Sequence, residues 1–396
     1  MLDKTVRQAE WQKPLTENPG TSHTLPARCY IDPEYYRQDV EQIFYKTWQY
    51  VGHKSQFANP GDYVTAKIAD QNIVVIRNKT GELQGFHNVC KHRAHELLSG
   101  EGNIKNVIVC PYHAWTYDLD GKLRSGPYLS RMEEFDRGEV RLSPVRVEWL
   151  GPFVFANLDP DAVPLEEIAG DMLADMRAKV DWLDDELEIR GSYVAGLKEG
   201  QKSDWKVTIE NFLECYHCRV VHPAWADMTD MDKYEGGIYG YWATQFATEI
   251  KHDNKAYQID PNAPMQKGLF WTLWPNISFN FMPGERSLIV NIVHPLGHER
   301  SDFSGHIMYP PGEVENTSRV EYASQVLGME DLHICESVQR GLHSLGFDQG
   351  RIVATDLCHG TEEHAVHWLH WLINGVYEGQ GAYPPLPEAW KRAPAR

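Results

Sequence analysis

Two short segments of the sequence each carry one cysteine and one histidine, a pattern that predicts a metal centre. The first segment holds Cys90 and His92, and the second holds Cys110 and His113. Each pair lies at the end of a β-like run, so two tight loops could point all four side chains at one centre. Two thiolates and two imidazoles suit either zinc or a [2Fe–2S] cluster with two histidines on one iron. Zinc fingers usually pair cysteine with cysteine, whereas here each loop supplies one residue of each type, which favours the cluster.

A second concentration of candidate ligands is the segment ECYHCRVVHP, residues 214–223. Its two thiols, Cys215 and Cys218, could be half of a zinc site. No second cysteine pair or histidine pair completes a zinc tetrahedron near them in the sequence. We therefore expect both residues to be buried free cysteines, which behave as small hydrophobic side chains.

The histidines of the same segment, His217 and His222, favour a mononuclear iron site. Two histidines and one carboxylate on one face leave Fe(II) with open positions for O₂ beside a substrate. Residues five apart point about 140° apart on a regular helix, so the helix must end between them, and Pro223 favours such a break. The carboxylate could be Glu214, one helical turn before His217, or a distant acid.

The elements that must position these residues change in character along the chain. Residues 33–48 have a helical period, and residues 50–155 form short β-rich runs separated by turn signals. The elements expected after them are helices at 165–183, 204–218, 318–345 and 360–377 and strands within 238–310. This order predicts an all-β domain followed by an α+β domain, in which helices flank an antiparallel sheet.

The composition excludes several classes of function. The 396 residues carry a net charge of −18, which argues against nucleic acid and anionic membranes as partners. No apolar stretch approaches the ~20 residues of a membrane span, and the first residues lack the apolar region of a signal peptide. Seven cysteines, an odd number spread along the chain, fit a reducing compartment. We expect a cytoplasmic protein.

Both ligand segments resemble those of the Rieske non-heme iron oxygenase α-subunits. The first resembles the Rieske motif, usually C-x-H-R-G and C-P-Y-H-G-W, with Ala94 and Ala114 in place of two glycines and adding only a methyl group each. The second, DWKVTIENFLECYHCRVVHP, resembles the catalytic stretch of that family. The resemblance implies an α+β chain in which a Rieske domain at 45–160 precedes a helix-grip, START-like catalytic domain at 161–396. Residues 1–44 are expected to form a helical segment packed on the catalytic domain.

The resemblance also implies a role for each residue of the first segment. Cys90 and Cys110 would hold one iron of a Rieske [2Fe–2S] cluster, and His92 and His113 would hold the other. Trp115 is expected to shield the cluster from water.

For the mononuclear Fe(II), the family takes its carboxylate from a later helix, and GMEDLHICESVQRG supplies Asp331 at the matching place. The resemblance therefore favours His217, His222 and Asp331 as the iron ligands. In most members an aspartate three residues before the first histidine bridges a Rieske histidine of the neighbouring subunit to an iron ligand. Glu214 takes that position here and would bridge His113 of the partner subunit to His217.

The combination of ECYHC-x3-HP and CPYHAWTY resembles the quaternary-ammonium branch of the family, which includes carnitine oxygenase, glycine betaine monooxygenase and stachydrine demethylase. It implies N-demethylation of a betaine-like amine with release of formaldehyde. Hydroxylation of carnitine with release of trimethylamine is the first alternative, and dihydroxylation of an aromatic ring is another. Four aromatic residues could form part of a cation–π cage for the trimethylammonium group, although alternating aromatics also form sheet cores. They are Trp271, Trp274, Phe279 and Phe281.

The expected partners follow from the same resemblance. No G-x-G-x-x-G fingerprint follows a strand, so we expect a separate NAD(P)H-dependent reductase that carries flavin or an iron–sulfur centre. The family implies a head-to-tail homotrimer in which each active site uses its neighbour's cluster. A Rieske electron-transfer protein is the rival from another class, but the long chain beyond the cluster, with its second ligand set, argues against it.

Overall fold

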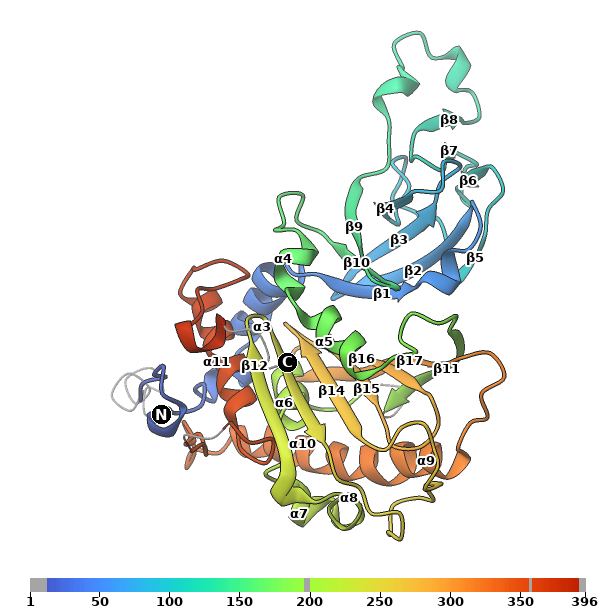
Figure 1. The fold of residues 1–396 in the computed structure, drawn as a ribbon. Helices are drawn as coiled ribbons and strands as arrows, with labels where there is room; N and C mark the ends of the chain where they lie inside the picture. Colours follow the sequence, from blue (N-terminus) through green and yellow to red (C-terminus); the bar gives the residue numbers. More distant parts are fainter. Residues whose placement is uncertain (1–12, 196–199, 356–357, 392–396) are drawn as a thin grey trace. The chain divides into compact units, whose positions relative to one another are not determined.

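The computed structural model describes residues 13–195, 200–355 and 358–391. The chain forms two compact units. The smaller is Phe44–Ile168, and the larger combines the residues up to Ile43 with those from Ala169 onward. Each unit has its own sheet (Figure 1). None of the described helices is both long enough and apolar enough to cross a bilayer.

The smaller unit is all-β, as the sequence predicts. Its main antiparallel sheet has seven strands in the order β1-β10-β9-β4-β3-β2-β5, and three short strands form a second sheet, β6-β7-β8. The strands are β1 Gln49–His53, β2 Asp62–Ile68, β3 Gln71–Arg77, β4 Leu83–His87, β5 Glu101–Asn103, β6 Val107–Val109, β7 Thr116–Asp118, β8 Leu123–Ser125, β9 Pro144–Leu150 and β10 Phe153–Asn157. Cys90 follows β4 and Cys110 follows β6, so strand ends place both ligand loops.

The C-terminal boundary of this unit lies at Ile168 rather than at residue 160. The chain after β10 packs back on the sheet, because Trp48 Nε1 donates to Val163 O at 2.8 Å. The amide of Leu165, where α4 (Leu165–Ala169) begins, donates to Glu148 Oε2 at 2.8 Å. These long-range hydrogen bonds leave no local pattern in the sequence, so the boundary could not be predicted closely.

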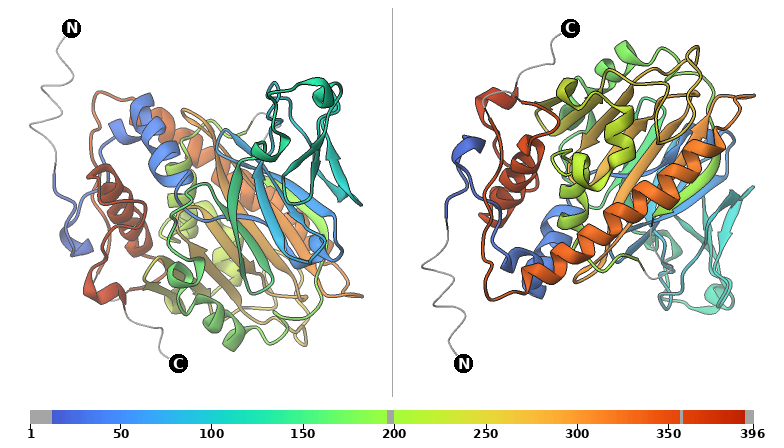
Figure 2. Two further views of the ribbon diagram at one scale, coloured as in Figure 1. Left: turned by 90° about the horizontal axis from the view of Figure 1, so that it is seen from above. Right: turned by 90° about the horizontal axis from the view of Figure 1, so that it is seen from below.

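The larger unit has a second seven-stranded antiparallel sheet, in the order β11-β17-β16-β15-β14-β13-β12. Its strands are β11 Glu188–Ala195, β12 Tyr234–Tyr239, β13 Trp242–Ala247, β14 Gly268–Leu273, β15 Ile277–Phe281, β16 Leu288–Gly297 and β17 Arg300–Tyr309. Its α-helices are α2 Arg28–Ile31, α3 Pro33–Gln38, α5 Met172–Lys179, α6 Trp205–Phe212, α7 Cys218–Val221, α8 Pro223–Met228, α9 Thr317–Glu321, α10 Gly328–Leu342 and α11 His364–Tyr377. Figure 2 shows α10 lying across one face of the sheet.

The two faces of this sheet have different partners. Trp271 of β14 is directly opposite Phe279 of β15, and Trp271 Nε1 donates to Asp175 of α5 at 2.8 Å. Phe270 and Asn280 are also directly opposite each other. Because successive side chains of a strand point to opposite faces, this second pair lies on the face away from α5.

The N-terminal segment is anchored to the larger unit through one buried carboxylate. Asp39 accepts hydrogen bonds from Trp205 Nε1 at 2.9 Å and from the Tyr377 hydroxyl at 2.6 Å. The ammonium group of Lys206 also pairs with Asp39, and both side chains are fully buried. Trp205 and Lys206, adjacent residues of the catalytic stretch, therefore attach the N-terminal segment to α6.

Two helices predicted as continuous contain π-helical turns. η2 (Asp39–Phe44) follows α3, and η7 (Tyr322–Leu327) joins α9 to α10. A π-helical turn widens the helix by one residue and often lies at a functional site. The apolar pattern continues through both turns, and neither turn contains glycine or proline. The sequence therefore does not indicate the change from α-helix to π-helix.

Candidate metal centres and the adjoining cavity

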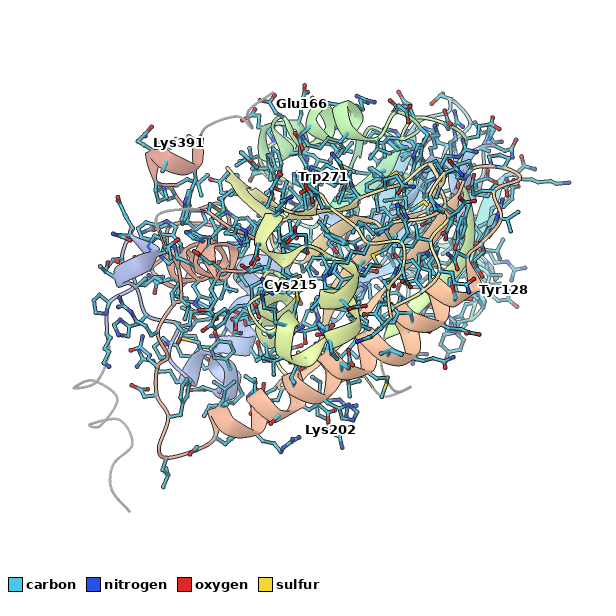
Figure 3. All side chains as sticks on the ribbon, turned by 60° about the horizontal axis from the view of Figure 1, so that its bottom comes forward. Tyr128, Glu166, Lys202, Cys215, Trp271 and Lys391 are labelled. Carbon is cyan, nitrogen blue, oxygen red and sulfur yellow. A yellow bond between two sulfur atoms is a disulfide. The ribbon has the colours of Figure 1, made fainter. Side chains whose placement is uncertain are left out.

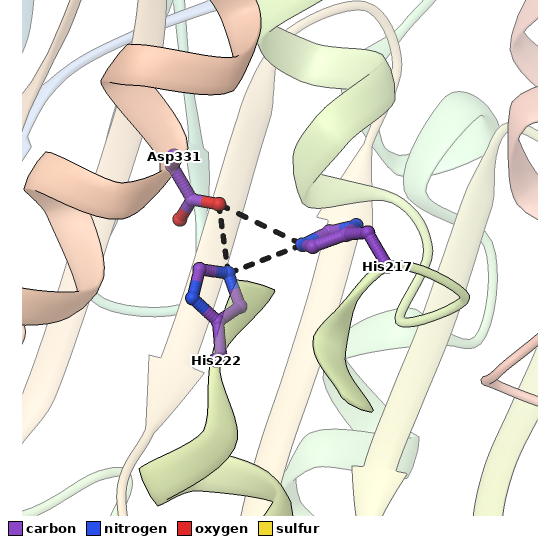
Figure 4. Close-up of side chains that lie close together, drawn as sticks. All are labelled: His217, His222 and Asp331. Carbon is purple, nitrogen blue, oxygen red and sulfur yellow. Dashed lines mark hydrogen bonds and ion pairs between the residues drawn. The ribbon is translucent and has the colours of Figure 1, made fainter. Parts of the chain in front are cut away.

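Two histidines and one aspartate converge in the larger unit (Figure 4). His222 Nε2 lies 3.1 Å from His217 Nε2 and 2.9 Å from Asp331 Oδ1, and His217 Nε2 lies 3.6 Å from the same oxygen. Within the described ranges, no other three metal-binding side chains bring all their ligand atoms within 4.8 Å of one another. Two imidazoles and one carboxylate suit Fe(II) with open positions. The group fits the mononuclear iron site expected from the sequence.

A break in the helical chain places both histidines at this centre. His217 directly precedes the single turn α7, and His222 lies at the junction of α7 and α8 with φ −115° and ψ 65°. Pro223 opens α8, in line with the predicted break. The helix predicted over 204–218 ends earlier than expected, at Phe212. The amide of Cys215 donates to Gly360 O at 3.0 Å instead of to a helical carbonyl.

The aspartate of the group comes from a distant helix. Asp331 stands in the first turn of α10, directly after the π-helical turn η7. Its Oδ1 accepts a 2.7 Å hydrogen bond from Asn211 Nδ2 of α6. This bond fixes the carboxylate relative to the helix that leads into the histidine segment.

Each histidine is held on its other nitrogen by a further carboxylate. Glu214 Oε1 lies 2.5 Å from His217 Nδ1, and Glu330 Oε2 lies 2.7 Å from His222 Nδ1. Carboxylates in this position fix the tautomer and raise the basicity of a ligating histidine. Both Nε2 atoms are therefore left for the metal, and Glu214 lies beside the converging group without joining it.

Sequence reasoning missed Glu330 and Asn211. The available signals were weak: Glu330 directly precedes Asp331, and Asn211 belongs to the E-N pair of the catalytic stretch. Their contacts depend on the packing of α10 against α6. No spacing rule within either helix reports that packing.

Charge interactions set the protonation of the group before a metal binds. Burial lowers the pKa of His217, but hydrogen bonds to Asp331 and Glu214 outweigh it and raise this pKa to about 9. Burial raises the pKa of Asp331, but hydrogen bonds to the two histidines bring it down to about 2. A metal ion must therefore displace a proton from His217 at neutral pH.

The prediction of free thiols at Cys215 and Cys218 is wrong, because the two residues form a disulfide with Cα atoms 4.9 Å apart (Figure 3). They do not share one helix: Cys215 lies in the turn after α6, and Cys218 opens α7. Both are buried, and Cys218 Sγ lies 4.0 Å from His217 Nε2. The disulfide therefore closes a small ring that contains His217.

The two ligand loops of the smaller unit have the same backbone hydrogen bonds. In each loop the cysteine amide, of Cys90 or Cys110, donates at 2.8 Å to the carbonyl five residues on. The amides of Ala94 and Ala114 donate back to the cysteine carbonyls at 3.0 Å. These alanines have φ of 57° and 54°, a left-handed conformation that is strained for alanine and free for glycine. The expectation that they add only a methyl group is incomplete, since they also strain the backbone.

The side chains of these loops fit a two-iron cluster better than a single zinc ion. The ring centroids of His92 and His113 are 4.6 Å apart, and Trp115 stacks on His92 at 4.9 Å. Unlike the iron group, the loop ligands of this described region do not all lie within 4.8 Å of one another, as expected for ligands spread over two irons. His113 Nδ1 is buried and has no hydrogen-bond partner among the described residues. Such an atom fits a metal bond.

A cavity of about 190 Å³ adjoins the histidine–aspartate group. Its lining surface is mostly apolar, but many of the lining side chains are polar or charged. The aromatic residues in the lining are Phe212, Trp225, Tyr234, Phe270 and Phe303.

The aromatic residues expected to form a cage, Trp271, Trp274, Phe279 and Phe281, do not line this cavity. Trp271 (Figure 3) lies on the opposite face of the sheet, bonded to Asp175. Residues one position apart in a strand point to opposite faces of the sheet, so an assignment that is off by one residue selects the wrong face. Phe270 and Asn280, each one residue from a predicted position, face the cavity instead. The expected strands are present, but the expected face is reversed.

Both units match known protein families. Residues 47–136 match the family described as the Rieske [2Fe-2S] domain. Residues 188–379 match the family described as the ring hydroxylating alpha subunit, catalytic domain. The two matches cover the loops with Cys90 and Cys110 and the segments with His217 and Asp331.

Individual relatives match over nearly the whole chain. The carnitine monooxygenase oxygenase subunit of Acinetobacter pittii is 36% identical over 361 residues, which cover 90% of this chain and 95% of the relative. A solved quaternary ammonium Rieske monooxygenase in complex with its substrate L-carnitine has a TM-score of 0.81 and 33% identity, covering 92% of this chain and 99% of that one. A structure of such an enzyme that gave insights into inter-subunit electron transfer has a TM-score of 0.83 and 33% identity, covering 92% and 98%.

Proposed function

Because this chain belongs to the family of Rieske oxygenase α-subunits, we propose that it hydroxylates a carnitine-like quaternary ammonium compound and so releases trimethylamine. The observation that carries the proposal is the 36% identity to a carnitine monooxygenase subunit over 95% of that relative's length. The relatives favour this reaction over the N-demethylation of a betaine that the motif resemblance led us to expect.

The lining of the cavity supports a cationic substrate. A trimethylammonium group has no N–H to donate, so aromatic rings recognise it by cation–π attraction. Trp225, Tyr234 and Phe270 line the cavity together with His217 and His222. We assign the aromatic contacts of the substrate to these three residues in place of the four chosen from the sequence.

The chain's part in the reaction is to hold and orient. His217, His222 and Asp331 would hold the mononuclear iron, a ligand set that leaves positions open for O₂. When bound there, Fe(II) supplies the O₂ chemistry. Glu214 and Glu330 fix both imidazoles through their Nδ1 atoms. The apolar part of the cavity wall would limit the contact of bulk water with the reacting carbon.

A Rieske [2Fe–2S] cluster would be held by Cys90, His92, Cys110 and His113 and would supply electrons to the mononuclear iron. A separate NAD(P)H-dependent reductase supplies them. The contact of Glu214 with His217 supports its role as a bridge: in a homotrimer, this carboxylate joins His113 of the partner subunit to His217. The relative known for inter-subunit electron transfer supports the same arrangement.

The proposed reaction balances as a monooxygenation. A C–H bond beside the quaternary nitrogen becomes C–OH with one atom of O₂, and the other atom leaves as water with two electrons and two protons. The hydroxylated carbon then loses trimethylamine and a proton and becomes an aldehyde. N-demethylation inserts oxygen into an N-methyl C–H bond instead and releases formaldehyde.

Product analysis tests the proposal. The holoenzyme is supplied with a generic reductase and, in turn, with L-carnitine, glycine betaine and stachydrine. Trimethylamine from L-carnitine is the expected result, and His222→Ala should abolish it. Formaldehyde from glycine betaine or stachydrine, with no trimethylamine from carnitine, would establish the N-demethylase alternative.

A further inference from the structure

Two buried side-chain amides belong to residues that line the cavity, and each has an oxygen that no described residue satisfies. Asn280 of β15 and Asn291 of β16 both line the cavity, with 3% and 8% of their surface exposed. In the part of the chain that the structure describes, neither Oδ1 atom has a hydrogen-bond partner. A buried amide oxygen without a partner is costly, so these two acceptors point to a ligand that donates hydrogen bonds.

The surroundings fix the direction of the first amide. Asn280 Nδ2 donates to Ser278 Oγ at 3.0 Å and to Ile289 O at 3.2 Å, both within the sheet. With its nitrogen used in this way, Asn280 presents its oxygen as the remaining polar atom. Ser278 is paired with Asn291 in the register of β15 and β16, so the two amides are diagonal neighbours on one face.

We propose that Asn280 and Asn291 form a subsite for an aliphatic hydroxyl group of the substrate. This subsite rests on the proposed function and deepens it. A carnitine-like substrate has three polar groups. The trimethylammonium group has no N–H, and the carboxylate only accepts hydrogen bonds. The hydroxyl is the single group able to donate to an amide oxygen, and its one hydrogen can satisfy one of the two oxygens at a time. The two asparagines therefore make the cavity selective for a hydroxylated quaternary amine over its deoxy analogue.

Binding by the holoenzyme tests the subsite without turnover. L-carnitine and γ-butyrobetaine, which lacks the hydroxyl, are titrated calorimetrically in the absence of O₂ and reductase. The subsite predicts about tenfold tighter binding of L-carnitine, the effect of one neutral hydrogen bond to a buried acceptor. In Asn280→Leu and Asn291→Leu, which replace the amide by an apolar group of similar shape, the ratio of the two dissociation constants should fall toward one.

Asn276 provides the matched control. It is a buried asparagine whose Oδ1 also lacks a partner among the described residues, yet it does not line the cavity. Asn276→Leu should leave the ratio of dissociation constants as in the unmodified protein. Asn280 also donates two hydrogen bonds within the sheet, so Asn291→Leu is made as a separate variant that keeps them. The ratio in the unmodified protein tests the subsite in either case.

The binding results distinguish failure of the hydroxyl subsite from failure of the proposed function. Equal binding of L-carnitine and γ-butyrobetaine by the unmodified protein, or a ratio unchanged in the cavity variants, would overturn the subsite while leaving the proposed function intact. Failure of either compound to bind, with no trimethylamine formed, would overturn the proposed function and the subsite with it.

Discussion

The two candidate metal centres are built in opposite ways. In the smaller unit, four ligands stand on two loops with the same backbone hydrogen bonds, and each loop supplies one cysteine and one histidine. In the larger unit, the ligands come from separate helical segments, and Asp331 is 109 residues away from His222. The first centre is specified locally, whereas the second exists only when α10 packs beside α6.

The difference extends to what surrounds the ligands. In the larger unit, Glu214 holds His217 and Glu330 holds His222. In the smaller unit, His92 stacks on Trp115, and His113 Nδ1 has no partner among the described residues. Loop geometry thus positions the candidate cluster ligands, while hydrogen bonds between distant residues position the candidate iron ligands.

The largest effects should come from removing one ligand of each centre. His222→Ala should abolish mononuclear iron and leave the visible spectrum of the cluster, because the cluster loops lie in another unit. Cys110→Ala should abolish that spectrum and leave the mononuclear iron. Iron, acid-labile sulfide and absorbance measured on both variants check this prediction. If one substitution emptied both centres, their independence would be contradicted.

The two orienting glutamates should have separable effects. Glu214→Gln and Glu330→Gln should each weaken Fe(II) binding by about 10- to 100-fold, because each removes a carboxylate from a ligating histidine. Once iron is added, Glu214→Gln should still stop electron transfer between the centres, Glu214→Asp should restore part of it, and Glu330→Gln, the matched control, should permit it. Iron titration and single turnover from a prereduced cluster measure the two properties. Iron lost in Glu214→Gln and retained in Asp331→Asn would make Glu214 a ligand instead.

Iron loading of the larger unit should depend on pH. Burial lowers the pKa of His217, but its hydrogen bonds to Asp331 and Glu214 raise it to about 9. Below that pH, Fe(II) must displace one proton, so its apparent affinity should increase up to about tenfold for each unit of rising pH. Fe(II) titrations between about pH 6 and pH 8 test the slope, with the cluster spectrum as an internal reference. A flat profile would show that His217 is already neutral.

The smallest effects should come from the strained loop positions of the smaller unit. Ala94→Gly and Ala114→Gly should each stabilise it by up to about 1 kcal/mol, because glycine adopts positive φ without strain. Chemical denaturation followed by the cluster absorbance measures the change. Substituting an alanine with negative φ, such as Ala66 in β2, by glycine provides the opposite control and should destabilise.

This contrast also explains what the sequence could predict. The loop ligands could be proposed from the sequence because the segments around Cys90 and Cys110 contain everything that shapes these loops. The all-β and α+β units and the convergence of His217, His222 and Asp331 were likewise expected, the last through the family resemblance. The role of Glu330 could not be predicted, because its contact with His222 depends on the packing of segments far apart in the sequence.

The remaining errors have definite physical causes. The aromatic cage was assigned to the wrong face because Trp271 and its neighbour Phe270 differ by one position in a strand, and only the packing of α5 decides between them. The break after Phe212 follows from a backbone hydrogen bond between Cys215 and Gly360, far apart in the sequence. The expectation of free thiols rests on the absence of a second ligand pair, whereas the break after Phe212 brings Cys215 and Cys218 themselves together.

The disulfide between Cys215 and Cys218 gives this protein two covalent forms, one with the ring closed and one with the ring open. A sample is therefore defined by its disulfide state as well as by its metal content. The ring-closed and ring-open forms differ by two hydrogen atoms and contain the same residues. His217 belongs to a cycle in the first form and to an open chain in the second. Preparations made with and without a thiol reagent are therefore different chemical species, and intact mass should accompany every iron measurement.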